Sequence, residues 1–440
     1  MNTTSFGVVL RRYRLAAGLT QEELAERAHL STRAISDLER GLKKEPRPST
    51  VRLLTAALGL EDPATLVSAV RSDDNGPTES LAAVYDVPVA LTSLVGREGD
   101  LAQALEGLTR HRLLTLVGPG GIGKTRLAVA VAEAARRQFP DGVYWVGLAG
   151  LTDSDAVAST VAAALGVGGR ADARALVGAV RGKRLLLVVD NCEHLINGCA
   201  RTLELLLEGG DRLRILATSR GPIGEVISRV GSLGTPDPDA DLDVIESAPS
   251  VRLLVERARA GLPEFTVTPS SSAVLARVCE LLGGNPLALE LAAARLPVLS
   301  PRELLERLGD SLSILVGGAT TAEQRQQSVR ATLEWSLDLL NPRERELFDR
   351  LAAFASGWNL AAAEAICVDA DLPTCIVLDA MAGLVKKCLV DARPEPDGET
   401  RFTWHSVIRQ FARERLGSAE RVAALRRRHA LYLLNQVETA

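Results

Sequence analysis

The segment between residues 113 and 125 restricts the fold of this chain more than any other. A largely apolar run, Leu113–Val117, leads into GPGGIGKT, which ends at Lys124 and Thr125, and an amphipathic helical pattern follows. The spacing G-x-x-x-x-G-K-[ST] between a buried strand and a helix is typical of a phosphate-binding loop. Its glycines let several backbone N–H groups point at one anion, and the helix N-terminus adds its dipole. The segment therefore predicts a nucleotide site beside a parallel sheet.

The residues of this predicted site have separate expected tasks. We expect Lys124 to hold the β- and γ-phosphates of ATP and the Thr125 hydroxyl to ligate Mg²⁺. The run RLLLVVD ends at Asp190, the second expected Mg²⁺ ligand, for which capping of the next helix is the alternative. Asn191 follows it and can orient water but cannot take its proton, which predicts slow ATP hydrolysis. The run RILATS precedes Arg220, which we expect to sense the γ-phosphate or else to form a surface salt bridge. The loop residues expected to contact the nucleotide are Gly118, Gly120, Gly121, Ile122, Gly123, Lys124, Thr125 and Arg126.

The apolar pattern changes along the chain. Between residues 112 and 220, apolar runs at 112–117, 143–149, 184–190 and 214–219 alternate with helical patterns. That alternation is typical of a parallel sheet whose strands are buried on both faces. From residue 250 onward the pattern is mostly helical, and 393–400 is expected to be a turn between two short strands. Stretches with a linker or loop composition occur at 71–80, 234–243 and 317–320.

Composition narrows the class of protein. Hydrophobic residues make up 46% of the 440 residues and charged residues 24%, so the chain has enough material for about three domains of roughly 150 residues. No apolar run approaches the roughly 18 residues that a membrane span needs, which predicts no membrane partner. The 6 cysteines are scattered without a close pair. This favours a reducing compartment, and we expect a cytoplasmic protein.

The first 60 residues predict a small, basic helical module. Two short helices separated by a tight turn would bury Leu24, Ala28, Ile35 and Leu38, with Ser31 capping the second helix. This segment holds ten basic and six acidic residues, a net charge of +4. Because the whole chain has a net charge of −4, the other 380 residues carry a net charge of −8. Two such helices form a helix-turn-helix, whose second helix fits the major groove of DNA. A basic head on an acidic body is typical of a nucleic-acid-binding module.

The string LTQEELAERAHLSTRAISDLERG resembles the phage-repressor (Xre/Cro-like) helix-turn-helix family. The resemblance implies double-stranded operator DNA as a partner. The alternative is that these polar side chains only solvate a small helical domain. Such modules usually work as dimers on two half-sites, which predicts self-association elsewhere in the chain. The implied base contacts are Thr32, Arg33 and Asp37, and the implied phosphate contacts are Gln21, Lys43 and Lys44.

Motifs across residues 93–417 resemble, in order and spacing, the NB-ARC/STAND signal-transduction ATPases, in particular actinomycete transcriptional regulators. They are LVGRE, the phosphate-binding loop, LLLVVDNCEHL, LATSR, GGNPLALELAAARL and FTWHSVIRQFARERL. The resemblance implies a helical lid that reaches the nucleotide through Pro286, and a winged-helix domain whose His405 contacts the ADP β-phosphate. An ordinary half-buried histidine is the alternative for His405. The residues implied around the adenine are Val95, Gly96 and Arg97.

Two features depart from the family pattern. Ser406 stands where an aspartate usually follows the histidine, and Trp404 precedes it, so we expect a weaker resting-state lock. Family members also continue into long helical repeats, whereas this sequence ends soon after the expected helix at 418–440. One helical pair does not make a stable solenoid. Either the chain is truncated or another protein supplies the sensor.

Together these patterns predict a multidomain chain with an all-α head, an α/β parallel-sheet domain, a helical lid and a winged helix. The expected function is a DNA-binding transcriptional regulator switched off by ADP and on by ATP and Mg²⁺, which self-associates when it is ATP-bound. The alternative is an immunity-like effector whose ATP-driven assembly is the output and whose head serves only autoregulation. The expected bounds are 1–66 for the head, 67–92 for a linker, 93–235 for the nucleotide domain, 236–318 for the lid, 319–417 for the winged helix and 418–440 for a terminal helix.

Overall fold

A computed structural model forms two compact units, Met1–Leu81 and Ala82–Ala440, which we describe separately. For a few helical residues, Arg33 and Asp37 among them, only the backbone is described. The described residues are 10, 14, 21–28, 30–39, 48–57, 87–90, 92–167, 172–315, 328–354, 357–369, 372–396, 398–415 and 419–439.

The first unit contains the predicted helix-turn-helix. Helix α2 (Gln21–Arg27) is followed by α3 (Thr32–Glu39) and later by α4 (Pro48–Ala57). The Ser31 hydroxyl accepts a hydrogen bond from the Ala34 N–H at 3.2 Å and caps α3 as predicted. The four expected core residues, Leu24, Ala28, Ile35 and Leu38, are all buried in one cluster with Leu10, Val51 and Leu54. The helical pattern of the head is therefore confirmed.

The second unit is built on a five-stranded sheet in the order β2-β3-β4-β1-β5, with every pair parallel. Four strands coincide with the predicted apolar runs: β1 (Leu113–Val117), β2 (Val143–Gly147), β3 (Leu186–Asp190) and β4 (Arg214–Ser219). Sequence reasoning missed β5 (Ile227–Arg229), which pairs with β1. Three residues are too few to show a periodic pattern, so only the tertiary pairing with β1 defines this strand.

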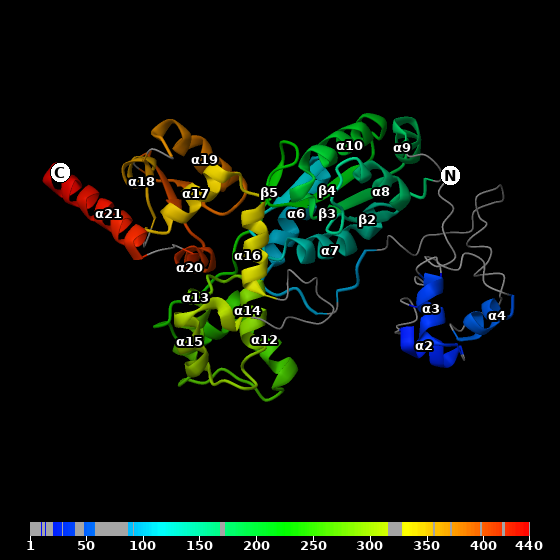
Figure 1. Cartoon of the computed structure of the whole chain (residues 1–440), viewed down its shortest axis with the longest axis horizontal. Helices are drawn as coiled ribbons and strands as arrows, with labels where there is room; N and C mark the ends of the chain where they lie inside the picture. The colour runs from blue at the N-terminus through cyan, green and yellow to red at the C-terminus, as the bar shows by residue number, and fades with distance from the viewer. Residues whose placement is uncertain are drawn as a thin grey trace. The chain divides into compact units, whose positions relative to one another are not determined.

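Helices cover both faces of the sheet (Figure 1). On one face, α6 (Glu98–Arg110) and α7 (Lys124–Ala135) pack on alternate strand residues such as Leu186 and Val188. The intervening residues, such as Leu187 and Val189, pack on the other face. Strand side chains point alternately to the two faces, so burial on both explains the continuous apolar runs. The helices of the second face are α8 (Ala156–Ala164), α9 (Ala173–Val180) and α10 (Ile196–Gly209).

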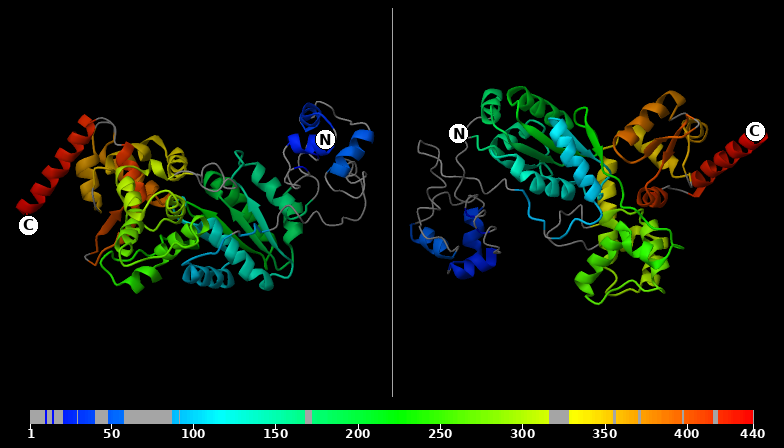
Figure 2. Two further views of the ribbon diagram at one scale, coloured as in Figure 1. Left: turned by 90° about the horizontal axis from the view of Figure 1, so that it is seen from below. Right: turned by 180° about the vertical axis from the view of Figure 1, so that it is seen from behind.

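The helices after the sheet share one hydrophobic core. Residues of the lid segment and of the winged-helix segment pack in a single cluster that also takes in Val95. Helix α16 lies between the sheet and the lid in each view (Figures 1 and 2). The lid holds α11 (Leu242–Ser247), α12 (Pro249–Gly261), α13 (Ser272–Leu281), α14 (Pro286–Ala293) and α15 (Pro301–Asp310). The following part holds α16 (Val329–Asp338), α17 (Pro342–Leu351), α18 (Leu360–Cys367), α19 (Thr374–Lys386), β6 (Asp391–Pro394), β7 (Thr400–Thr403), α20 (Ser406–Arg415) and α21 (Ala419–Thr439).

The predicted multidomain fold class is confirmed by this architecture. The expected turn at 393–400 joins the antiparallel strands β6 and β7. Several helices begin at predictable caps; for example, Ser300 and Glu303 form a capping box at α15. Val87, inside the predicted linker, is buried against α6 and α7. Within the described residues, no helix is both long and apolar enough to span a membrane.

Candidate nucleotide site

The topology brings three functional segments to one edge of the sheet. The phosphate-binding loop follows β1, Asp190 ends β3 and Arg220 follows β4. Strand β4 lies between β3 and β1, so Arg220 leaves the sheet between Asp190 and the loop. The carboxyl edge of a parallel sheet is where ligands bind in open α/β folds. The sequence-predicted residues of this site are therefore brought together.

The loop has the backbone that its glycines permit. Gly121 and Gly123 have φ angles of +75° and +94°, in the region that disfavours side chains. The Nζ of Lys124 donates hydrogen bonds to the carbonyls of Gly118 at 2.8 Å and Pro119 at 3.0 Å, which holds the ammonium across the loop. Burial lowers the pKa of Lys124, and the charges of Glu193 and Asp190 act in the opposite direction. The loop geometry and the buried ammonium fit a bound phosphate chain.

Asp190 and Thr125, the two residues expected to ligate Mg²⁺, lie within hydrogen-bond distance of each other. The Thr125 hydroxyl donates to the Asp190 carboxylate at 2.9 Å, and the Thr218 hydroxyl donates to the same oxygen. Burial raises the pKa of Asp190, partly offset by these hydrogen bonds. A hydroxyl and a carboxylate are hard oxygen donors of the kind that Mg²⁺ prefers beside nucleotide phosphates. The donor set fits this ion.

Asn191 and Glu193 complete the edge of the site beyond β3. Asn191 has a left-handed φ of +67°, and its backbone N–H donates to the Thr218 hydroxyl at 2.9 Å. Glu193 lies in the short helix η2 (Cys192–His194), and only 5% of its side chain is exposed. One of its carboxylate oxygens is buried without a hydrogen-bond partner among the described residues. Sequence reasoning did not place Glu193 in the site, because the turn at Asn191 decides where it points.

Arg220 forms a buried ion pair that links the sheet to α16. Its Nε donates to Glu193 at 3.1 Å, with 7% of the Arg220 side chain exposed. Its Nη1 donates to the hydroxyl of Ser336, a residue of α16. The Thr332 side chain on the same helix lies so close to the loop that a Cβ on Gly120 would be 2.6 Å from its methyl group. The pair is thus enclosed by the protein and does not lie on the surface.

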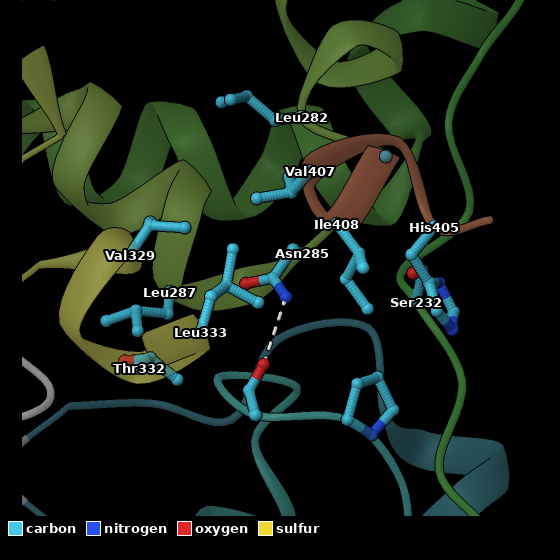
Figure 3. Close-up of a pocket in the computed structure, with 13 residues that line it drawn as sticks. Ser232, Leu282, Asn285, Leu287, Val329, Thr332, Leu333, His405, Val407 and Ile408 are labelled. Carbon is cyan, nitrogen blue, oxygen red and sulfur yellow. Dashed lines mark hydrogen bonds between the residues drawn. The ribbon is translucent and has the colours of Figure 1, made fainter. Parts of the chain in front are cut away.

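The lid contacts the loop through the start of α14. The Asn285 side chain caps α14 and donates to the Gly120 carbonyl at 3.3 Å (Figure 3). The Leu287 N–H donates to the Gly121 carbonyl at 3.1 Å. Pro286 is the first residue of the helix, where its missing N–H costs no hydrogen bond. The predicted residue Pro286 is therefore held next to the phosphate-binding loop.

The segment Val95–Arg97 is wedged between the loop and the lid. Val95 is buried in the lid core, and a Cβ on Gly96 would be 2.5 Å from Pro249. The Arg97 guanidinium donates to the Ile122 carbonyl at 2.9 Å. Arg126, also predicted to touch nucleotide, donates to Thr92, to the Ser93 carbonyl at 3.0 Å and to Glu290 at 3.3 Å.

His405 reaches the loop from the winged-helix segment. It lines a pocket with Pro119 and Gly120 from the loop and with lid and α16 residues, and Figure 3 shows it beside Ser232. Its Nε2 lies 3.3 Å from the carboxylate of Asp391 on β6. Asp391 thus places a carboxylate beside His405 from β6. The free volume of this pocket, about 10 Å³, is close to what one water needs, so a nucleotide fits in it only if the lid, α16 or His405 moves.

The predicted DNA contacts are described only in part. Gln21 begins α2, and Thr32, the first residue of α3, is exposed. Arg33 and Asp37 lie on α3, but their side chains fall outside the described part of the chain, as do Lys43 and Lys44.

Comparisons with known families match three parts of the chain. A helix-turn-helix family matches residues 10–64, an AAA domain family matches 108–220 and a winged helix-turn-helix family matches 340–417. The chain is 38% identical over 360 residues to an uncharacterized protein of Mycobacterium tuberculosis, covering 80% of this chain and 88% of that protein. The chain belongs to the family of this mycobacterial protein.

Longer relatives carry regulatory names. A Mycobacterium tuberculosis protein named "Putative HTH-type transcriptional regulator" is 41% identical over 318 residues, 71% of this chain and 34% of that protein. The regulatory protein AfsR of Streptomyces coelicolor is 28% identical over 97% of this chain and 42% of its own length. The chain thus spans well under half the length of these two regulators. By its family matches the chain carries a helix-turn-helix region, an AAA domain and a winged helix-turn-helix region, the modules that the resemblance implied.

Among solved structures, the chain is similar to a STAND protein with a tetratricopeptide repeat sensor from Pyrococcus horikoshii. The match covers 80% of this chain and 46% of that protein. It is 19% identical to this chain, with a TM-score of 0.33.

Proposed function

We propose that the chain is a DNA-binding transcriptional regulator whose phosphate-binding loop switches it between an ADP-bound off state and an ATP-bound on state. The observation that carries the proposal is the convergence of the lid, α16 and His405 on this single loop. Asn285 and Leu287 bond to the loop carbonyls, and Thr332 lies against Gly120. The contacts of the lid, α16 and His405 with the loop therefore depend on which nucleotide the loop binds.

The charges of the site support a switch that depends on the terminal phosphate. Arg220 is buried and is shared between Glu193 and Ser336, so it joins the nucleotide domain to α16. A γ-phosphate near the loop offers this guanidinium a stronger, doubly charged partner. We infer that Arg220 turns towards the γ-phosphate in the on state and releases Ser336, which frees α16. With ADP, Arg220 keeps both protein partners.

The same residues indicate slow hydrolysis. Lys124 would hold the phosphates, and Thr125 and Asp190 would hold Mg²⁺, which neutralises charge on the phosphates. Asn191 orients water but accepts no proton from it. Glu193, the nearby carboxylate, is paired with Arg220 at 3.1 Å in this arrangement, so the slow turnover is inferred from Asn191. We therefore propose at most a slow regulatory ATPase.

The energetic requirement is large but within reach. Shifting a two-state equilibrium from 1:99 to 99:1 takes about 5.5 kcal/mol of differential binding. Charge-assisted hydrogen bonds contribute about 1.5–3 kcal/mol each, so two or three contacts made only to the γ-phosphate would suffice. We propose that released chains self-associate and present paired heads to operator DNA, with the signal coming from a separate sensor protein or from repeats beyond this sequence.

We propose that the chain has the parts expected from its sequence. The head spans 1–66, the linker 67–92, the nucleotide domain 93–235, the lid 236–318, the winged helix 319–417 and the terminal helix 418–440.

The test compares two single variants of the full chain. Calorimetry measures ADP and ATP affinity, light scattering measures mass with each nucleotide, and gel shift measures operator binding. Lys124→Ala is expected to abolish nucleotide binding and ATP-dependent assembly. Arg33→Ala is expected to keep both and to weaken specific DNA binding. Unchanged ATP and ADP affinity in Lys124→Ala would refute the site, and equal mass with ADP and ATP in the wild type would refute the switch.

A further inference from the structure

Arginines mark the amino ends of three neighbouring strands, at the edge of the sheet opposite the nucleotide site. Arg112 directly precedes β1, Arg184 lies two residues before β3, and Arg214 is the first residue of β4. Strands β3, β4 and β1 are adjacent, so the parallel topology gathers the three guanidinium groups at one edge. Nothing in the proposed switch uses this cluster.

A cavity of about 460 Å³ opens at this edge. Three arginines (Arg184, Arg212 and Arg214) and one aspartate (Asp211) line it, so its charged lining has two more positive than negative groups. Leu108 and Phe139 supply apolar lining. The space exceeds the roughly 300 Å³ at which small-molecule pockets begin.

Two guanidinium groups at this edge, that of Arg214 in the cavity lining and that of the neighbouring Arg112, are held by neutral acceptors. Arg214 donates to the carbonyls of Leu108 at 3.0 Å and Leu213 at 3.2 Å. Arg112 donates to the carbonyls of Leu207 and of Gly210, the latter at 2.7 Å. Each guanidinium has five N–H donors, so these carbonyls leave donors for a ligand. The carboxylate of Asp141 is engaged by the Arg184 backbone N–H at 2.6 Å.

Mutual repulsion in the cluster is not neutralised. Burial lowers the pKa of Arg214, and the charges of Arg112 and Arg184 lower it further. No carboxylate lies within 4.0 Å of the guanidinium of Arg112, Arg184, Arg212 or Arg214 among the residues that the structure describes. An anion placed between these groups would remove the repulsion and accept several charge-assisted hydrogen bonds at once.

We propose that this cavity, the amino-edge pocket, is a second anion site that binds a small phosphate-bearing ligand. A hollow with the partly buried Arg214 in its lining suits a compact anion better than the backbone of duplex DNA. Because the pocket is at the opposite edge of the sheet from Lys124, both sites accept ligands at the same time. The proposal is independent of the nucleotide switch.

The test uses inorganic pyrophosphate as probe and calorimetry on the full chain carrying Lys124→Ala, so that the phosphate-binding loop does not contribute. Pyrophosphate is expected to bind this background. The double variant Arg184→Gln/Arg214→Gln should weaken pyrophosphate binding about tenfold or more, because it loses hydrogen bonds between charged groups. Arg212 is exposed, so Arg212→Gln is expected to keep the fold and to weaken binding several-fold. The control is Arg302→Gln, an exposed arginine on α15 of the lid, which is expected to change nothing.

Absence of pyrophosphate binding in the Lys124→Ala background overturns the proposal. Equal affinity in the arginine variants and the Arg302→Gln control overturns it as well. If a non-specific DNA duplex displaces pyrophosphate, and the arginine variants lose duplex binding in proportion, the ligand is a nucleic-acid backbone and the small-ligand assignment is wrong.

Discussion

Adding one methyl group to the phosphate-binding loop should push α16 away from it. Gly120 does not have a left-handed φ, so alanine adopts its backbone without strain. The new Cβ would lie 2.6 Å from the Thr332 methyl and 3.2 Å from the Arg220 guanidinium. The first distance is well inside van der Waals contact, so α16 or the loop must shift. Gly120→Ala therefore perturbs docking of α16 and adds no charge or polar group.

The size of the effect follows from core packing. Inserting a methyl group into a well-packed contact costs about 1–3 kcal/mol. At about tenfold per 1.4 kcal/mol, the ratio of docked to undocked α16 should fall by about 5-fold to 150-fold. Thr332→Ser removes the opposing methyl and keeps the hydroxyl that donates to the Ser328 carbonyl at 3.1 Å. The double variant should recover most of the loss, with a coupling of about 0.5–3 kcal/mol in the double-mutant cycle.

Trp335 on α16 offers a direct assay. Its ring packs edge-on against His194 of the nucleotide domain, with centroids 5.8 Å apart, so undocking changes its surroundings. Tryptophan fluorescence is measured during a urea titration with and without the Trp335→Phe substitution. The difference between the two signals reports on Trp335 and therefore on α16. Gly99→Ala is the matched control because its Cβ meets no atom within 4 Å. The expectation is refuted if α16 docks as stably in Gly120→Ala as in Gly99→Ala. It is also refuted if the free-energy changes of Gly120→Ala and Thr332→Ser are additive in the double variant.

Three further predictions concern buried charges. Burial alone would raise the pKa of Asp391, but the hydrogen bond and charge of His405, with the charges of Arg393 and Arg229, outweigh it and lower the pKa below its ordinary 3.8. The stability that this pair contributes should therefore be present above that pH and be lost as the pH falls below it. The unfolding temperature of Asp391→Asn should then fall less on acidification than that of the wild type. Burial raises the pKa of Asp190, which means that folding disfavours its charge near neutral pH. Asp190→Asn should then raise the unfolding temperature without Mg²⁺ and remove any stabilisation by Mg²⁺; a lower temperature in metal-free buffer contradicts this. Arg220→Met should cost about 3–5 kcal/mol in urea unfolding by leaving Glu193 buried and unpaired, and adding Glu193→Leu should restore part of the loss, whereas additive losses would contradict a coupled pair.

The sequence alone determined the features that depend on neighbouring residues. The glycine spacing before Lys124 defines the loop, because positive φ angles and a helix start are local properties. The strands ending at Asp190 and before Arg220, and the buried face of the helix-turn-helix, followed from the periods of apolar residues. The meeting of these strands at one edge followed from parallel topology.

Only the tertiary structure decided which side chains become partners. Glu193 pairs with Arg220 from 27 positions away, Ser336 reaches Arg220 from 116 positions away, and Asp391 lies 3.3 Å from the His405 ring. No local pattern marks such pairs, because each depends on how whole domains pack and on a single turn, such as the left-handed Asn191, that aims one side chain. The same holds for the amino-edge pocket, whose arginines are ordinary strand-flanking residues until the sheet order places them side by side. Local periodicity specifies elements, and packing between distant elements specifies the charges that face one another.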